Sequence, residues 1–291
     1  MIPRNGKNDM VDGYKVVTCS PVGRKRYVEI QVNFLLKLRH IIDKHVFWIN
    51  TNDPDDLKYF DELIEKYPDF FEKLIVDLDD LPTKGMNVGK FYKYHTDPNT
   101  IYCKIDDDIV FMQLSKFEDF IRFRIKNPQY YLVYANIINS GLSFFLHNKC
   151  GAFTFNTCPK VEYSCTNDAW KNAQHAVFSF NEFFNRLTND ELYKFNFGTW
   201  ILSDYERHSI NFISWFGSEF AKIDHSYWEF DDETWLSQYR PAERFMPNCI
   251  YGGFLVVHYA FYTQREKLDA NKSLLDKFKY LSEHIEMKNP A

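Results

Sequence analysis

The sequence predicts an α/β protein built on a Rossmann-type mixed sheet flanked by helices. Short apolar runs typical of buried strands alternate with helical stretches through the first third of the chain. Alternation of this kind implies parallel strands joined by right-handed crossovers. The 291 residues are 45% hydrophobic and 18% aromatic, which is enough to fill one substantial core. We therefore expect a single compact domain of two joined halves, covering residues 1–291.

Three strand-and-helix passages make up the first part of the expected sheet. The buried face of the first helix is marked by Tyr27, Ile30 and Phe34, at spacings of three and four residues. The second helix begins at Asp53-Pro54, where aspartate is a good cap and proline suits the first helical position. The carboxyl ends of the strands should meet at one rim of the sheet, where α/β proteins bind ligands. The expected strands of this part are residues 14–19, 45–50, 73–78 and 101–105.

The second part of the chain is expected to add two strands and several helices. Ser115 and Glu118 have the spacing of a capping box, so a helix should begin there and stop before Pro128. A strand over residues 130–138 should precede a loop-rich stretch over residues 139–166. The remaining expected elements are a helix over residues 170–187 and a glycine turn at Gly252-Gly253 that feeds a hydrophobic strand ending near Tyr259.

Composition and charge exclude several kinds of protein. The net charge is -5 and the pI is about 6.0, so no basic face for nucleic acid is expected. No apolar run approaches the roughly 20 residues that span a bilayer, and residues 1–12 do not resemble a signal peptide. The six cysteines show no CxxC pairing, so reduced thiols are expected. These features predict a soluble cytoplasmic protein with no nucleic-acid partner and no membrane span.

Three consecutive carboxylates, Asp106, Asp107 and Asp108, interrupt a buried apolar segment at the end of the fourth expected strand. We call them the Asp cluster. Adjacent carboxylates repel one another by roughly 1 kcal/mol or more per close pair, so the cluster needs a counter-charge, and a divalent cation is the natural one. The alternative is a solvated turn capped by its own carboxylates. A surface turn does not need Ile105 and Phe111 beside it, so we expect a metal site.

A basic turn follows the first expected strand. Arg24, Lys25 and Arg26 occupy the first turn of a helix, where cations oppose the helix macrodipole. Two explanations remain open, an anionic ligand at the strand end or a solvated basic turn. Residues 18–20, residues 50–52 and the Asp cluster should meet at the same rim of the sheet.

Three later stretches carry polar groups that suit a functional site. Residues 231–233 form a second acidic cluster, bracketed by aromatic residues and placed at a helix start. His258 ends a hydrophobic strand, and a histidine in that position is structural unless it comes near the Asp cluster. Residues 195–209 alternate aromatic and polar side chains, which suits either a sugar-binding surface or an ordinary domain interface.

Together these motifs resemble a GT-A glycosyltransferase. The resemblance rests on a DxD-type motif after the fourth strand, an acidic motif before a helix and a late histidine, in this order over most of the chain. The chain is similar to small soluble glycosyltransferases of bacteria and large viruses that have a KIDDDIVF-like segment and a VVHYAFYTQR-like end. The resemblance implies transfer of a sugar from a nucleoside-diphosphate sugar, commonly a UDP-sugar such as UDP-xylose, to a glycan hydroxyl. It implies a GT-A-like domain with a nucleotide-binding half over residues 13–112, an acceptor-binding half over residues 113–265 and a C-terminal helix over residues 266–291.

The resemblance also implies roles for individual residues. Asp106 would face the nucleotide ribose or the donor sugar, while Asp108 and His258 would hold Mn²⁺ or Mg²⁺ against the diphosphate. Asp232 would be the base that deprotonates the acceptor in an inverting displacement. The motif around it reads DDE rather than a clean xED, so both neighbouring carboxylates remain rivals. The residues expected to bind the donor are Thr18, Ser20, Arg24, Asn50, Lys90, Asp106 and Asp107.

Two other functions stay open. Asp106 and Asp108, followed by Val110, also match the motif of haloacid-dehalogenase-type phosphatases, in which the first aspartate is a nucleophile and the second an acid. In that family the motif follows the first strand of the core, whereas here three strand-and-helix passages precede it. The other alternative is a glycan-binding or scaffolding protein with an inactive transferase fold, against which the presence of Asp108, Asp232 and His258 argues.

Overall fold

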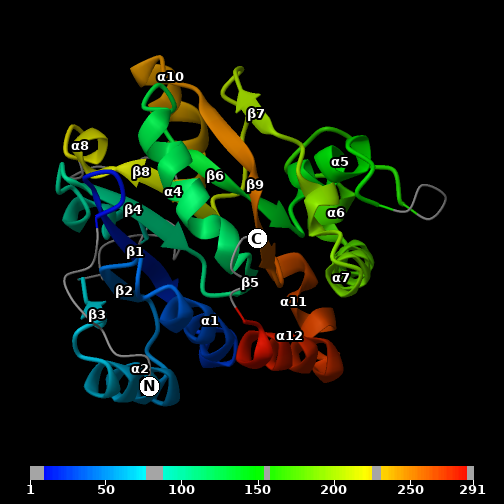
Figure 1. Ribbon diagram of the computed structural model, residues 1–291, viewed down its shortest axis with the longest axis horizontal. Helices are drawn as coiled ribbons and strands as arrows, with labels where there is room; N and C mark the ends of the chain where they lie inside the picture. Colours follow the sequence, from blue (N-terminus) through cyan, green and yellow to red (C-terminus); the bar gives the residue numbers. More distant parts are fainter. Residues whose placement is uncertain (1–9, 77–87, 154–157, 225–230, 287–291) are drawn as a thin grey trace.

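A nine-stranded mixed sheet runs through the middle of the protein in the computed structural model (Figure 1). The structure describes residues 10–76, 88–153, 158–224 and 231–286. The strand order is β3-β2-β1-β4-β8-β6-β9-β5, and β7 pairs with β9 outside this path. The strands are β1 Lys15–Val22, β2 Lys44–Ile49, β3 Phe71–Leu74, β4 Thr100–Ile105, β5 Ile109–Met112, β6 Val133–Ile138, β7 Thr199–Leu202, β8 Phe212–Phe216 and β9 Asn248–His258.

The first four strands form the parallel part of the sheet. β1 pairs with β2 and β4, and β2 pairs with β3, all in parallel. Helices α1 (Lys25–Lys37) and α2 (Pro54–Lys66) connect these strands. Asp53 caps α2 by accepting hydrogen bonds from the backbone N–H groups of Asp55 and Asp56, as its position before a proline predicts. The alternation of strands and helices in the sequence therefore predicts the first two passages correctly. Between β3 and β4 the structure describes only the 3-10 turn η1 (Tyr92–Tyr94) as a named element, and residues 77–87 lie outside the described residues.

Two of these strands differ in extent from the prediction. β1 continues through the predicted turn to Val22, because its last two residues pair with the end of β2. β3 begins at Phe71 and pairs with β2 from there, two residues before the predicted start at Lys73. Residues 77–78 of its predicted span lie outside the described residues.

The remaining strands mix directions. β8 is antiparallel to β4 and β6, while β9 is antiparallel to β5 and β7 but parallel to β6. The register of β9 on β6 shifts between Ala135 and Asn136, opposite Gly252 and Gly253. The predicted glycine turn is therefore wrong, since both glycines lie inside one long strand. Gly252 is needed there because an added Cβ would lie 2.5 Å from the carbonyl oxygen of Gly198.

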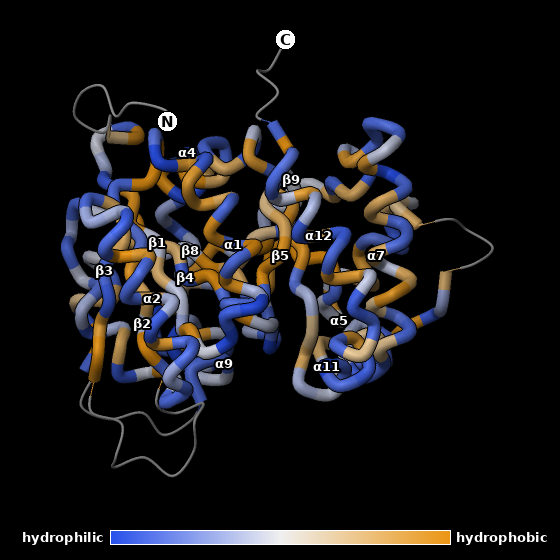
Figure 2. The backbone as a smooth tube through the Cα atoms, turned by 90° about the horizontal axis from the view of Figure 1, so that it is seen from below, coloured by the Kyte–Doolittle hydropathy of each residue, from blue (hydrophilic) through white to orange (hydrophobic). Residues whose placement is uncertain are grey.

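Two hydrophobic clusters cover the two faces of the sheet. Successive residues of a strand point to opposite faces, so Ile101, Cys103 and Ile105 of β4 join one cluster while Tyr102 joins the other. Figure 2 shows the hydrophobic colours concentrated along the strands and the hydrophilic colours on the outer turns of the helices. The sheet thus separates two cores, and polar side chains gather where its strands end.

The structure corrects three predictions about the second part of the chain. Helix α4 (Phe117–Lys126) has no side-chain cap, because the residues before it form a 3-10 turn in place of the predicted capping box. The predicted loop after β6 contains a helix, α5 (Gly141–Lys149). The C-terminal part forms two helices, α11 (Tyr262–Asp269) and α12 (Lys272–His284), where one was predicted.

The predicted helix after residue 170 is confirmed in α7, although a break at Asn172 separates it from the short α6. In Figure 1, α5, α6 and α7 lie together at one end of the sheet, and α12 lies beside α1. The last five residues of the predicted C-terminal helix, 287–291, lie outside the described residues. The other elements are η1 Tyr92–Tyr94, η2 Leu114–Lys116, α6 Asp168–Lys171, α7 Ala173–Thr188, η3 Leu192–Phe195, α8 Gly217–Phe220, α9 Asp232–Thr234, the π-helical turn η4 Trp235–Tyr239 and α10 Arg240–Arg244.

The predicted fold class is confirmed as a single α/β domain with a Rossmann-type mixed sheet flanked by helices. The division into nucleotide-binding and acceptor-binding halves stays a prediction. All six cysteines are described, and each is a free thiol. Among the described residues, no helix has the length and apolar character that crossing a membrane requires.

We expect Gly252→Ala to destabilise the protein more than Gly253→Ala. An added Cβ at residue 252 meets backbone atoms of Gly198, whereas at residue 253 it meets the side chain of Tyr251, which can move. Forcing extra volume against fixed atoms costs typically about 1–3 kcal/mol. Urea unfolding of both variants measures the difference, and equal losses would contradict the close approach of β7 to β9.

Candidate active site

The Asp cluster forms the tight turn between β4 and β5. The backbone N–H of Asp106 donates to the carbonyl oxygen of Asn211 at 2.8 Å, and Ile109 N–H donates to the Asp106 carbonyl at 3.1 Å. The side-chain amide of Gln31, on α1, donates to the same carbonyl at 2.7 Å. Because the turn is held by bonds to two other parts of the chain, its three carboxylates have fixed and different surroundings.

Asp106 is bound by two side chains at its two oxygens. Lys104 forms an ion pair with Oδ1, and Asn211 Nδ2 donates to Oδ2 at 2.9 Å. The Lys104 side chain is 3% exposed, and its ammonium also donates to the carbonyl of Ile210 at 3.0 Å. Burial acts to lower the pKa of Lys104, but the charges of Asp106 and Asp232 outweigh it and raise that pKa. The ammonium therefore stays charged inside the protein.

Asp107 ties the Asp cluster to the end of β1. It accepts a hydrogen bond from Gly23 N–H at 3.2 Å and from Arg24 Nε at 3.0 Å, and a second guanidinium nitrogen of Arg24 contacts its other oxygen. Burial raises the pKa of Asp107, and the charge of Arg24 offsets this in part. Two guanidinium nitrogens on one carboxylate form the bidentate arrangement that fixes both groups.

Asp108 lies among three basic groups. Arg24 Nη1 is 3.0 Å and Arg265 Nη2 is 3.5 Å from its Oδ2, and His258 Nε2 is 3.1 Å from its Oδ1. Burial acts to raise the pKa of Asp108, but Arg24, His258 and Arg265 together hold it well below its usual value. The prediction that His258 comes near the Asp cluster is thus met by a direct contact.

These contacts correct the argument that the Asp cluster needs a metal as its counter-charge. Arg24, Lys104 and Arg265 supply positive charge from the chain itself. The basic turn before α1 is explained in the same way, because Arg24 binds the Asp cluster and Arg26 binds Asp269 at 2.7 Å. The sequence left an anionic ligand and a solvated basic turn open as explanations, and the structure shows instead that both arginines of the turn pair with protein carboxylates.

A divalent cation nevertheless has a fitting place at Asp108. Its Oδ1 atom is buried and has no well-aligned hydrogen-bond donor, although His258 Nε2 lies beside it. A carboxylate oxygen next to an imidazole nitrogen is a pair of ligand types that suits Mn²⁺ or Mg²⁺. The described residues contain no group of three or more histidine, cysteine or carboxylate side chains placed to hold a metal. Asp108 and His258 are thus the two residues that would hold such a cation.

The second acidic cluster has three carboxylates in three different roles. Asp231 caps α9, accepting from the backbone and hydroxyl of Thr234 at 2.9 and 3.0 Å. Glu233 pairs with Arg207 at 2.8 Å. Asp232 is buried between these neighbours and accepts a hydrogen bond from the Tyr92 hydroxyl at 3.2 Å. The aromatic residues before the cluster, 228–230, lie outside the described residues.

Asp232 lies where the two acidic clusters meet. Its pKa is raised to about 7, chiefly by burial and also by the charge of Asp106, while Lys104 acts against this rise. Lys104 interacts with both Asp106 and Asp232, so it links β4 to α9 electrostatically. A half-ionised carboxyl at neutral pH is suited to take up a proton from a substrate.

Three residues of this arrangement were missed from the sequence. Lys104 sits within the predicted fourth strand, where a single lysine among apolar residues was the signal that it is buried and paired. Tyr92 and Arg265 had no local signal, because each meets its aspartate from a distant part of the chain. His258 ends β9 and Arg265 lies on α11, the next helix, and both side chains contact Asp108.

Only some of the residues predicted to bind the donor lie at the rim of the sheet. Thr18 and Ser20 are buried within β1 rather than at its end, and Thr18 contacts His45 at 2.8 Å while Ser20 donates to Gln31 at 3.0 Å. Their role in donor binding stays a prediction. Asn50 follows β2 at the rim and donates its N–H to the end of β1. Lys90 is half-buried two residues before Tyr92.

A polar hollow of about 590 Å³ opens where β1 and β2 end. It begins beside Arg24, which joins it to the Asp cluster, and it extends to the N-terminus of α2. Helix N-termini and basic side chains favour bound anions, while the aspartates of the hollow can accept hydrogen bonds from hydroxyl groups. The residues that line it are Gly23, Arg24, Lys25, Arg26, Glu29, Thr51, Asp53, Asp55 and Asp56.

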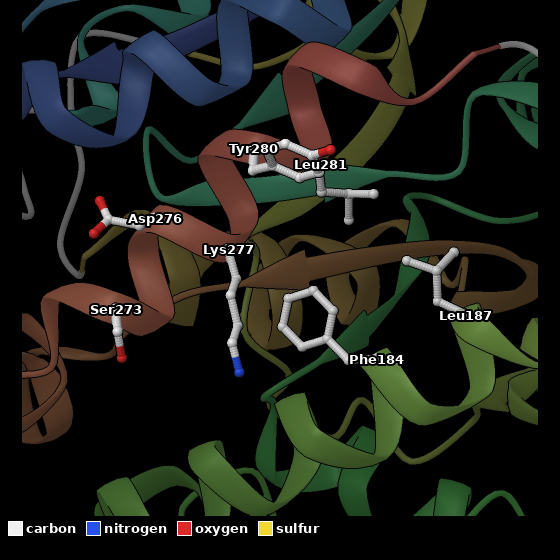
Figure 3. Close-up of a pocket in the computed structure, with 7 residues that line it drawn as sticks. All are labelled: Phe184, Leu187, Ser273, Asp276, Lys277, Tyr280 and Leu281. Carbon is white, nitrogen blue, oxygen red and sulfur yellow. The ribbon is translucent and has the colours of Figure 1, made fainter.

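A second hollow, of about 560 Å³, lies between α7 and α12 and is mainly apolar (Figure 3). Lys277 points toward the ring of Phe184 across it, with the ammonium 5.9 Å from the ring centre. None of its lining residues belongs to the predicted site. They are Phe184, Leu187, Ser273, Asp276, Lys277, Tyr280 and Leu281.

No protein-family model and no curated protein matches the sequence. The structure is similar to 4-diphosphocytidyl-2C-methyl-D-erythritol synthase from Anaerococcus prevotii, with 14% identity, a TM-score of 0.47, and 93% of this chain and 100% of that chain covered. It is also similar to CMP:2-keto-3-deoxy-manno-octonic acid synthetase complexed with CTP, with 10% identity, a TM-score of 0.48, and coverage of 90% and 99%. The inositol-1-phosphate CTP transferase from T. maritima gives 8% identity, a TM-score of 0.45, and coverage of 92% and 97%. None of these three is named as a UDP-sugar glycosyltransferase, and likenesses this low carry no argument about activity.

We expect the stability of the protein to depend on the ionisation of Asp232. Burial raises its pKa from 3.8 to about 7, so this group stabilises the fold fully below about pH 4 and loses that effect as the pH rises through about 7. The free energy of unfolding should fall by up to about 4 kcal/mol across this window, because a pKa difference of one corresponds to about 1.36 kcal/mol.

Urea unfolding of the wild type and of Asp232→Asn between about pH 4 and pH 8 measures this contribution. Burial also raises the pKa of Asp107 and Glu233, so only the difference between the two proteins reports on Asp232. The asparagine variant should lose stability less steeply with rising pH. Identical slopes would mean that Asp232 ionises in the folded protein as it does in the unfolded chain.

Proposed function

We propose that this protein is a metal-dependent glycosyltransferase. It would move a sugar from a nucleoside-diphosphate sugar, with UDP-sugars such as UDP-xylose as the first donors to test, to a hydroxyl group of a glycan acceptor. The observation that carries the proposal is the position of Asp232, buried beside the Lys104–Asp106 ion pair with a pKa of about 7. Activation of an acceptor hydroxyl needs a base that is poised near neutral pH.

The chemistry assigns one task to each acidic cluster. The acceptor oxygen attacks the anomeric carbon as the bond from that carbon to the diphosphate oxygen breaks, and the bonding electrons leave with the nucleoside diphosphate. The acceptor proton passes to Asp232, which Tyr92 orients through its 3.2 Å hydrogen bond. The charge of Lys104 keeps part of the Asp232 population ionised near neutral pH. A positioned base of this kind contributes about 10² to 10⁴-fold to the rate.

The leaving diphosphate would be held on the other side of the Asp cluster. Arg24 lies between Asp108 and the polar hollow at the ends of β1 and β2, so it can contact a phosphate as well as a carboxylate. Arg265 adds a second guanidinium beside Asp108. Asp108 and His258 would hold the cation, which when bound stabilises the negative charge of the leaving group as a Lewis acid.

The proposal predicts that UDP and Mn²⁺ stabilise the protein together. A ligand at 100 times its dissociation constant should contribute about 2.7 kcal/mol, and thermal shift with UDP, GDP, CDP and ADP, each with and without Mn²⁺, measures this. Asp108→Asn should keep the fold and lose the stabilisation that depends on Mn²⁺. His258→Ala should raise the required concentrations of Mn²⁺ and nucleotide together, because one cation would bridge both.

Turnover then separates the proposal from its alternatives. Release of UDP from a UDP-sugar should require Mn²⁺ or Mg²⁺ and stop in excess EDTA. Phosphate release from p-nitrophenyl phosphate without an acceptor would instead indicate the phosphatase, and pyrophosphate release from CTP would indicate a nucleotidyltransferase. Binding of glycans without turnover of any nucleotide sugar would indicate the inactive glycan-binding alternative.

A separate prediction concerns the base. Asp232→Asn should lower turnover by about 10²-fold or more while leaving the affinity for the donor little changed, since an amide cannot take the acceptor proton. Asp231→Asn and Glu233→Gln are matched controls, because Asp231 caps α9 and Glu233 pairs with Arg207. Each control should affect stability more than turnover. A loss of turnover confined to either control would move the base to that residue.

A further inference from the structure

Two exposed aromatic side chains, Tyr163 and Trp200, form what we call the aromatic platform. Trp200 lies on β7 and is 38% exposed, and Tyr163 lies in the segment before α6 and is 36% exposed. The ring centres are 6.0 Å apart, and the Trp200 indole N–H donates to the Tyr163 hydroxyl at 2.8 Å. These contacts hold both rings in place at the surface, with part of each ring open to solvent.

The platform is supported from below and has a carboxylate at its edge. Phe145 of α5 contacts the Tyr163 ring edge-to-face at 5.3 Å, so the ring cannot turn freely. The Tyr163 hydroxyl donates to Glu206 Oε1 at 3.1 Å. The second oxygen of Glu206, Oε2, is buried and has no hydrogen-bond partner. A buried acceptor without a donor is unfavourable, and a hydroxyl group of a bound ligand would supply the missing donor.

The platform is connected to the proposed base through the chain. Arg207 follows Glu206 directly and binds Glu233, the residue next to Asp232. His208 comes next, is fully buried beside the ring of Tyr134 at 4.9 Å, and has no hydrogen-bond partner at either ring nitrogen. Residues 206–208 therefore connect the exposed aromatic platform to the acidic cluster that contains Asp232. Glu206 and His208 each have a buried polar atom without a hydrogen-bond partner.

We propose that Tyr163, Trp200 and Glu206 bind the acceptor, and that the acceptor is an uncharged oligosaccharide. This inference rests on the proposed function and names its substrate class. The apolar face of a pyranose ring stacks on an aromatic ring while its hydroxyl groups donate to neighbouring oxygens, and the platform offers both partners. Glu206 and the nearby Asp204 would repel a sulfated or carboxylated glycan. The negative charge beside the platform thus favours neutral sugars over anionic ones.

The test measures binding of cellopentaose, mannopentaose and xylopentaose by calorimetry, without nucleotide and without metal. At least one pentasaccharide should bind the wild type. Trp200→Ala and Glu206→Gln should each weaken it about tenfold or more, a change of about 1.4 kcal/mol. Trp200→Phe should retain most of the affinity because it keeps a stacking face. Tyr193→Ala is the matched control, since Tyr193 is an aromatic residue of η3 that is 68% exposed and outside the platform.

Melting temperatures of the variants show whether each is folded, so weaker binding by a folded variant assigns the subsite. Absence of binding by all three pentasaccharides, or equal affinity of Trp200→Ala and wild type, would overturn the inference. A protein that binds a pentasaccharide at the platform but does not turn over a nucleotide sugar would refute the proposed function and keep the glycan site. If the protein turns over a nucleotide sugar and the acceptor KM of Trp200→Ala equals that of the wild type, the proposed function stands and the glycan site at the platform is refuted.

Discussion

The buried ion pair between Lys104 and Asp106 is the interaction on which the candidate site depends. Placing an ammonium inside a protein is costly, and the cost is met here by Asp106, by the carbonyl of Ile210 and by the charge of Asp232. Lys104 acts on two carboxylates at once, Asp106 in the turn after β4 and Asp232 on α9, and its charge favours the ionised form of Asp232. The raised pKa of Asp232 follows from this environment, in which burial outweighs a single nearby cation.

The other two carboxylates of the same turn are also paired with basic side chains. Asp107 and Asp108 share Arg24, and Asp108 also contacts His258 and Arg265. A divalent cation that binds Asp108 must share the carboxylate with two guanidinium groups of like charge. Under the proposed function, a diphosphate would relieve this conflict, because it would provide negative charge for the arginines and oxygen ligands for the cation. Metal binding and nucleotide binding are therefore expected to depend on each other.

The sheet explains how one site draws on distant parts of the chain. β8 runs antiparallel beside β4, which brings Asn211 and Ile210 to the Asp cluster, and β9 ends at His258 beside the start of β5. The edge strand β7 carries Trp200 away from this centre to the surface. The proposed donor and acceptor sides thus belong to different strands of one sheet, held together by backbone pairing rather than by a hinge.

The sequence by itself determined the strand-and-helix alternation of the first part, the cap of α2 at Asp53 and the place of the Asp cluster at a strand end, because these depend on contacts between near neighbours. Only the tertiary structure decided which member of residues 231–233 faces Asp106, and that Lys104, Tyr92 and Arg265 join the site. It also replaced a presumed metal counter-charge by arginine and lysine side chains, and it moved Thr18 and Ser20 from the rim into the core. The reason is physical: ionisation, burial and pairing are set by groups brought together from distant positions, which no local pattern of residues records.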